Sequence, residues 1–194
     1  MKKICLFFLL LISITPVFAQ DGFVFDKGID KVTVPMVLIN NLVFIPIKVN
    51  GIELNFLLDT GVEETILFSL EDNPDVKFYN SEKITLRGLG SEVAIEGLKT
   101  TNNILELEGM KSHHQLVYVI LDESFNLSSQ IGIPVNGIIG YQFFKDNLIR
   151  IDYTGKKVII YKNDEENRKK FEKKFKVTPI TLERLKPYLI GNVV

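Results

Sequence analysis

The sequence predicts an all-β fold, a barrel or a sandwich made of many short strands. Segments rich in branched apolar residues recur at close spacing, and turn signals such as Asn50-Gly51 separate them. No sustained alternation of strand and helix patterns is present, which argues against a Rossmann-type parallel sheet. With 194 residues, 46% of them hydrophobic and 24% charged, the chain can form one domain with an adequate core.

The start of the chain predicts a secretory signal over residues 1–19. Two lysines precede an apolar run at 4–14, and Val17-Phe18-Ala19 is typical of a cleavage site after Ala19. The run is short for a bilayer span and Pro16 follows it, so a signal is favoured over a single-pass anchor. We therefore expect an exported bacterial protein, periplasmic or extracellular, without a stable membrane anchor.

The composition excludes several function classes. The only cysteine, Cys5, lies inside the expected signal, so the mature chain offers no disulfide, no Cys-ligated metal and no thiol nucleophile. A formal net charge of -1 does not indicate nucleic acid as a partner. His113 and His114 are adjacent, and on a strand they would point to opposite faces, most simply at exposed positions. The sequence therefore predicts neither a metal nor a cofactor.

The expected elements follow one another closely along the chain. We expect strands at 32–39, 42–49, 52–58, 62–68, 83–89, 93–98, 104–107, 115–121, 148–153 and 157–161. A short helix is expected at 141–145, just after a glycine. Residues 163–176 are almost all charged, with Phe171 and Phe175 one helical turn apart, and predict a helical linker. Residues 177–194 predict a strand-like tail.

One acid stands where a buried strand ends. Phe56-Leu57-Leu58 runs directly into Asp59-Thr60-Gly61, and Gly61 permits a tight turn because it has no Cβ. The chain has no Gly-x-Ser-x-Gly elbow, no His-Glu-x-x-His and no phosphate-binding loop ending in Lys-Ser/Thr. Two carboxylates that share one proton can activate a water without metal or thiol. Asp59 is a candidate for one of them.

The segment 56–61 resembles the active-site loop of the pepsin and retropepsin clan of aspartic peptidases. Ile138, Ile139 and Gly140 are similar to the apolar-apolar-Gly motif that packs beneath that loop in the clan, and 87–91 is similar to its glycine-containing flap. The resemblance implies a closed, retropepsin-like barrel lobe over 32–162.

The resemblance also implies residue roles. Asp59 would be the catalytic acid of an aspartic-type endopeptidase, Thr60 would hydrogen-bond to a partner loop, and Gly61 would admit the turn. The flap residues Gly88, Leu89 and Gly90 would close over a peptide or protein substrate.

This sequence departs from the clan's pattern at three places. Val62 stands where a small residue often follows the motif, and Asn136 stands before the Gly-Ile-Ile-Gly run where an acid is usual. The expected flap is also less rich in glycine than in viral enzymes.

The second acid of the dyad is missing. No second Asp-Thr-Gly or Asp-Ser-Gly occurs, and the segment 152–155 (Asp-Tyr-Thr-Gly) reads as a hairpin turn. Either two copies pair around a two-fold axis or a second lobe follows in a longer chain. Residues 186–194 resemble the run at 34–43 that opens the first lobe, which favours the second option. Secreted bacterial proteins similar to this one often carry two such lobes and a PDZ domain.

Two other functions remain open at the level of sequence. The chain could be a catalytically silent, peptide-binding lobe of the same fold. It could instead be an unrelated β-sandwich from an exported adhesion or carrier protein, in which Asp59 merely occupies a turn. The last hypothesis predicts that Asp59 lies away from Ile139 and Gly140.

Overall fold

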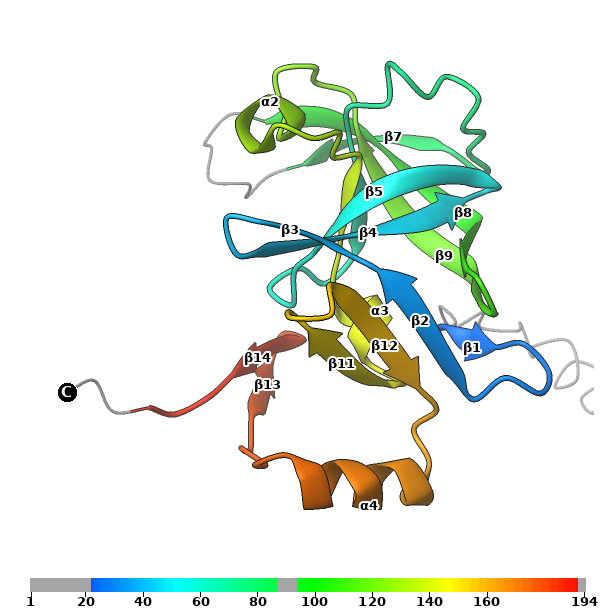
Figure 1. Ribbon diagram of the computed structural model, residues 1–194. Coiled ribbons are helices and arrows are strands. Elements are labelled where there is room, and N and C mark those ends of the chain that lie inside the picture. Colours follow the sequence, from blue (N-terminus) through cyan, green and yellow to red (C-terminus); the bar gives the residue numbers. More distant parts are fainter. Residues whose placement is uncertain (1–21, 87–93, 192–194) are drawn as a thin grey trace, which may run out of the picture.

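The computed structural model describes residues 22–86 and 94–191, and it is predominantly β (Figure 1). Its strands are β1 (Val24–Phe25), β2 (Lys31–Pro35), β3 (Val37–Ile39), β4 (Leu42–Val49), β5 (Ile52–Leu58), β6 (Thr65–Leu67), β7 (Glu82–Leu86), β8 (Ile95–Leu107), β9 (Met110–Ile120), β10 (Gly137–Ile139), β11 (Leu148–Asp152), β12 (Lys157–Tyr161), β13 (Thr181–Glu183) and β14 (Lys186–Tyr188). Its helices are α2 (Ser128–Ile131), α3 (Tyr141–Phe144) and α4 (Glu165–Lys174). Within these described ranges, no helix is both long enough and apolar enough to cross a bilayer.

The larger sheet has the order β1-β9-β6-β10-β5-β4-β8-β7, with β3 paired to β4. Because β8 also pairs with β9, the strands β9, β6, β10, β5, β4 and β8 form a closed circuit of pairings. The short strand β10 lies inside this circuit, parallel to β5 and antiparallel to β6. A complete acid-protease barrel stays a prediction.

The hairpin of β4 and β5 carries the chain to Asp59. Its two-residue turn has positive φ at both positions, 50° at Asn50 and 90° at Gly51, which is the backbone that an Asn-Gly hairpin turn requires. Along β5 the side chains of Leu54 and Phe56 are buried, as expected from period-two alternation. The observed strand ends at Leu58, so Asp59 is the first residue after it.

The core consists of two clusters, and β10 contributes to both. Ile139 belongs to the larger cluster with Phe56, whereas Ile138 belongs to a smaller cluster with Phe44 and Phe68. Successive residues of a strand point to opposite faces, so β10 is buried on both sides. A strand in this position has little freedom to shift.

The second sheet has the order β11-β12-β2, and α4 lies below it in Figure 1. Asp164 caps the helix by accepting a hydrogen bond from the backbone N–H of Asn167 (2.9 Å). Phe171 packs edge-on against Tyr161 of β12, with ring centroids 5.2 Å apart. The aromatic positions one turn apart in the charged segment therefore face the sheet.

Several predicted boundaries are wrong. From Ile95 on, the expected strands at 93–98 and 104–107 are parts of one long strand, β8, because two of the polar residues between them, Thr100 and Asn103, are buried and hydrogen-bonded. Asn103 donates to Oγ1 of Thr100 (2.9 Å) and to the carbonyl of Gln115 (3.1 Å). The expected strand at 32–39 is divided after Pro35 into β2 and β3, and β1 and α2 were not predicted.

Candidate active site

Three hydrogen bonds to backbone groups hold Asp59 in place. Its N–H donates to the carbonyl of Ile139 (3.0 Å), and its carbonyl accepts from the N–H of Val62 (3.2 Å). Its carboxylate Oδ1 accepts a hydrogen bond from the N–H of Gly61 (2.8 Å), which closes a turn of the Asx type. The side chain is half-buried. One carboxylate oxygen is thus fixed in direction by the turn that the Asp-Thr-Gly sequence forms.

The segment 138–140, which the resemblance places beneath the active-site loop, lies next to this turn. In the parallel pairing of β10 with β5, Ile138 is opposite Leu57 and Ile139 is opposite Leu58. The chain then turns at Gly140 into α3, whose Tyr141 N–H donates to the carbonyl of Val62 (2.9 Å). The structure therefore brings Asp59 and residues 138–140 together, as the resemblance implies. The hypothesis of an unrelated sandwich, which required their separation, is wrong on this point.

Gly140 has no room for a side chain. A Cβ at this position would overlap the carbonyl oxygen of Val62 and would lie 2.5 Å from the carbonyl oxygen of Asp59. The requirement for glycine thus comes from close approach of backbone to backbone. The two segments can hydrogen-bond only because this position lacks a Cβ.

Asn136 anchors the start of β10, and sequence reasoning missed this role. Its Oδ1 accepts from the N–H of Asn55 (3.1 Å), and its Nδ2 donates to the carbonyl of Ser69 (3.1 Å). Its backbone also exchanges hydrogen bonds with Asn55 and Phe68 (both 2.9 Å). A carboxylate could accept but not donate, so the departure from an acid at this position is explained by the bond to Ser69.

Of the other residues that the sequence analysis singled out, the structure describes those of the Asp59 loop but not those of the flap. Thr60 is exposed, and its side chain makes no hydrogen bond within the described ranges. Val62 does not crowd the loop, because its side chain packs against the smaller core cluster. Gly88, Leu89 and Gly90 lie outside the described residues. The strands on either side of them, β7 and β8, pair antiparallel with Leu86 opposite Ile95.

Two glutamates, Glu63 and Glu64, follow the Asp59 loop and act on a tyrosine of β9. Burial raises the pKa of Tyr118 on β9 above its ordinary value, and the negative charges of Glu64 and Glu63 add to the shift. Asp59 is in none of the ion pairs among the described residues. The same residues contain no group of three or more His, Cys, Asp or Glu side chains placed to hold a metal.

Asp152 and the pair of histidines at 113 and 114, which the sequence analysis also considered, do not form functional sites in the described structure. Asp152 accepts a hydrogen bond from the N–H of Gly155 (2.8 Å) and lies 3.4 Å from Arg150, so it is the hairpin turn that was predicted. His113 and His114 are both exposed, also as predicted. The alternation of the strand is broken at His114, whose φ of 55° belongs to a bulge opposite β8.

The chain matches no protein-family model and no curated protein. Among solved structures it is similar to a retropepsin-like aspartic protease from Rickettsia conorii, with 15% identity, a TM-score of 0.46, and coverage of 74% of this chain and 96% of that one. It is also similar to the EIAV protease complexed with the inhibitor HBY-793, with 21% identity, a TM-score of 0.33, and coverage of 60% and 86%.

Proposed function

We propose that this chain supplies one half of the catalytic site of an aspartic-type endopeptidase, with Asp59 as one of two acids. The observation that carries the proposal is the turn at 59–61, which fixes one carboxylate oxygen while the side chain stays partly open to solvent. The close packing of Gly140 against the backbone of Asp59 and Val62 fixes the position of the acid. This is an arrangement suited to chemistry, because a reacting group must be fixed and also reach its substrate.

The mechanism follows from bringing a second acid to the open side of Asp59. Two carboxyl groups about a hydrogen bond apart cannot both ionise, so they share one proton. The ionised member removes a proton from a water held between them, and that water attacks the peptide carbonyl. The protonated member donates its proton to the carbonyl oxygen, which gives a tetrahedral intermediate. The acid that took the proton from water then delivers it to the amide nitrogen, the C–N bond breaks, and an amine and a carboxylic acid leave. The pair titrates as a unit, so its two pKa values belong to neither residue alone.

The source of the second acid is part of the proposal. A second copy of the chain, related by a two-fold axis, would supply its own Asp59. A second lobe of a longer protein would supply an equivalent acid in the same place. In both cases exposed Thr60 is available to hydrogen-bond to the facing loop. The predicted flap residues Gly88, Leu89 and Gly90 would cover an extended peptide. The export signal at 1–19 would place these substrates outside the cytoplasm.

The test is cleavage of a quenched fluorescent peptide library by the wild-type chain, by Asp59→Asn and by Asp152→Asn. Asp59→Asn keeps the side-chain shape and removes the acid, so we expect a loss of about 10²–10⁴-fold or more in rate. Asp152→Asn is the matched control, because Asp152 also starts a turn before Thr-Gly but lies in the β11–β12 hairpin. It should retain wild-type activity.

Equal activity of wild-type protein and Asp59→Asn would refute catalysis by Asp59. If no preparation cleaves any peptide while the wild-type chain still binds peptides, the catalytically silent, peptide-binding lobe becomes the better explanation. Circular dichroism of each variant shows whether a loss of activity reflects unfolding.

A further inference from the structure

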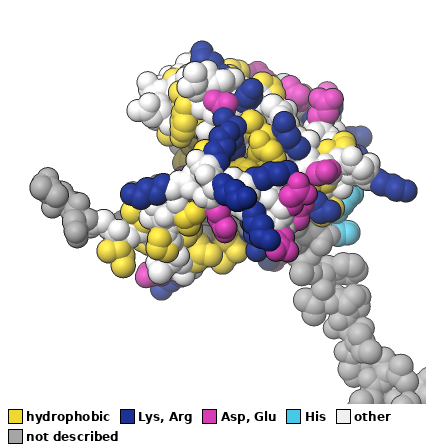
Figure 2. Space-filling view, turned by 60° about the horizontal axis from the view of Figure 1, so that its bottom comes forward, with side chains coloured by type: hydrophobic (Ala, Val, Ile, Leu, Met, Phe, Trp, Pro, Cys, Tyr) yellow, Lys and Arg dark blue, Asp and Glu magenta, His cyan; other side chains and the backbone are white. Residues whose placement is uncertain are grey.

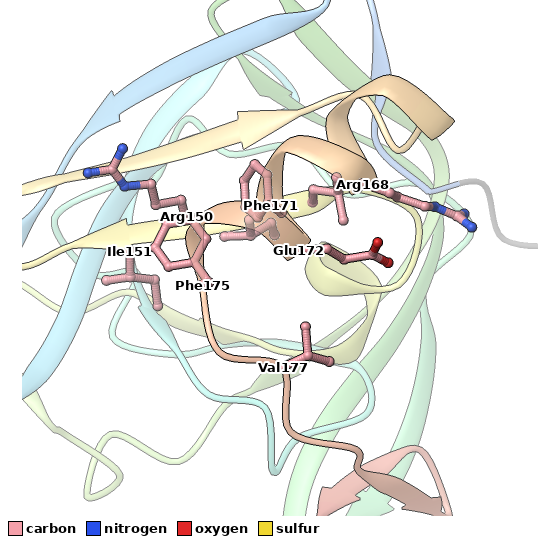
Figure 3. A pocket seen from close by; sticks show the side chains of 9 residues that line it. Arg150, Ile151, Arg168, Phe171, Glu172, Phe175 and Val177 are labelled. Carbon is pink, nitrogen blue, oxygen red and sulfur yellow. The ribbon is translucent and has the colours of Figure 1, made fainter.

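A groove of 390 Å³ lies between β11 and α4 (Figure 3), and none of its lining residues belongs to the Asp59 loop. Its lining includes four consecutive residues of β11, Leu148 to Ile151. Because neighbouring residues of a strand point to opposite faces, a groove that touches all four runs along the edge of the strand. Within the described residues β11 pairs with β12 alone, so this edge has no partner strand.

The opposite wall of the groove is aromatic. Phe171 and Phe175 extend from α4 toward the part of β11 where Arg150 and Ile151 lie, and Val177 adds to the wall just after the helix (Figure 3). Phe175 is 42% exposed and Val177 is 67% exposed. A free backbone edge facing an apolar wall is the setting in which an added β-strand gains both hydrogen bonds and side-chain burial.

The same chain carries a hairpin, β13–β14, that belongs to no larger sheet among the described residues. Strands β13 and β14 pair only with each other among the described residues, and a lone two-stranded hairpin is marginally stable in water. Cross-strand pairing places Leu182 opposite Pro187 on one face, with Ile180 two residues before Leu182 on that face. Leu182 is 53% exposed and Ile180 is 55% exposed. The hairpin thus has an apolar face that nothing covers in the described structure.

We propose that the β13–β14 hairpin of a second copy of this chain docks in the groove, adding to the free edge of β11 and covering the apolar wall of α4. Each copy has one groove and one hairpin, so two copies can exchange their hairpins reciprocally, and this exchange would close as a symmetric dimer. The hairpin begins six residues after Phe175, and an extended segment of that length spans about 20 Å, which is enough to reach a neighbour.

Charge favours a protein partner over a lipid surface. The rim of the groove carries Arg150, Arg168 and Glu172, and the hairpin carries Glu183 opposite Lys186. Signs are mixed on both sides, which suits pairing of Glu183 with an arginine and of Lys186 with Glu172. A membrane would also leave the strand edges without hydrogen-bond partners. Figure 2 shows hydrophobic side chains gathered on one side of the face that is turned forward in that view.

The test uses the absence of other thiols. In a Cys5→Ser background, which leaves the chain without cysteine, one protein carries Ile151→Cys on the groove and another carries Leu182→Cys on the hairpin. The two are mixed and treated with a short thiol-to-thiol cross-linker. We expect covalent dimers that contain one chain of each kind. The matched control replaces the hairpin variant with Val24→Cys, which is 64% exposed on β1. It should give at least about 10-fold less product.

A second measurement is independent of cross-linking. Sedimentation equilibrium should show a dimer whose dissociation constant rises at least about 10-fold in Leu182→Asp, while Val24→Asp leaves it unchanged. Product no greater than in the Val24→Cys control would overturn the proposal. So would a chain carrying both Ile151→Cys and Leu182→Cys that links only within itself, since the hairpin would then occupy its own groove. Neither readout depends on proteolysis, so both stand whatever the role of Asp59.

Discussion

Gly140 and Asn136 are the residues that fix the position of the segment 138–140 relative to Asp59. Gly140 allows two backbone segments to meet at hydrogen-bond distance, and Asn136 links the start of β10 to the middle of β5 and to Ser69, which follows β6. Neither side chain reacts in the proposed mechanism. Both act by placing the carboxylate, and both can be tested without measuring catalysis.

For Gly140→Ala we expect destabilisation of about 2–4 kcal/mol, because the added methyl group meets backbone atoms that cannot rotate away. Urea unfolding followed by circular dichroism measures the change. The matched control is Gly191→Ala, where the nearest atom to a new Cβ is 4.0 Å away. Similar stabilities for the two variants would show that the segments above Gly140 separate at little cost.

Asn136→Asp should lose about 1–3 kcal/mol at neutral pH, because a carboxylate cannot donate to the carbonyl of Ser69. Burial raises the pKa of the new carboxyl group in the folded state. The folded form therefore holds its proton more tightly than the unfolded form, whose carboxyl ionises near pH ~3.9. The variant should be closest to wild type at pH below about 4 and should lose stability as the pH rises.

The control for that experiment is Asn126→Asp. Asn126 uses its side-chain oxygen to accept from the N–H of Ser129, and an aspartate preserves this bond at an exposed position. Its stability should follow that of the wild type from about pH 4 upward, where the carboxylate is ionised in both states. A flat difference between Asn136→Asp and wild type across pH would contradict the assignment of a buried carboxylate.

At the scale of elements, β6 and β9 connect the Asp59 loop to the rest of the larger sheet. They pair in parallel, with Ile66 opposite Tyr118 and Thr65 opposite Val117. Glu63 and Glu64 lie between the loop and β6, and their charges act on the hydroxyl of Tyr118. Alkaline pH should therefore weaken the part of the sheet that carries the loop.

The raised pKa of Tyr118 fixes the sign of this effect. Below the ordinary value of 10.0, folded and unfolded states are both protonated and nothing is lost. Above it the unfolded chain ionises first, so stability falls as the pH rises through the folded pKa. Tyr118→Phe should lose less stability between pH 8 and pH 11 than wild type does, in urea unfolding at each pH. Tyr153→Phe, at a 55% exposed position, should behave like wild type.

At the scale of the whole molecule, a dyad built from two copies predicts a non-linear response to mixing. If Asp59→Asn chains are mixed with an equal amount of wild type and allowed to exchange, about one quarter of the dimers keep both acids. Peptidase activity should then fall to about 25% of that of the same total concentration of wild type. A value of about 50% would mean that the second acid is not supplied by a second copy.

The sequence by itself determined the short-range features of this protein. A few neighbouring residues are enough to predict the alternation along 52–58, the Asn50-Gly51 turn and the turn at Asp59-Thr60-Gly61. The structure has β5 and its hairpin at the predicted positions. The link between Asp59 and residues 138–140 was also predicted, but from a resemblance between motifs. Nothing in local propensity states that segments some eighty residues apart become parallel neighbours.

Only the tertiary structure decided how polar residues were used inside the protein. Asn103 and Thr100 appeared to interrupt a strand, yet their hydrogen bonds to the carbonyl groups of Gln115 and Val117 on β9 allow β8 to continue through the interior. Asn136 appeared to be a departure from a pattern, yet it is the link that holds β10 in place. Buried polar side chains are stable only when partners from distant segments satisfy them, and those partners are defined by the fold.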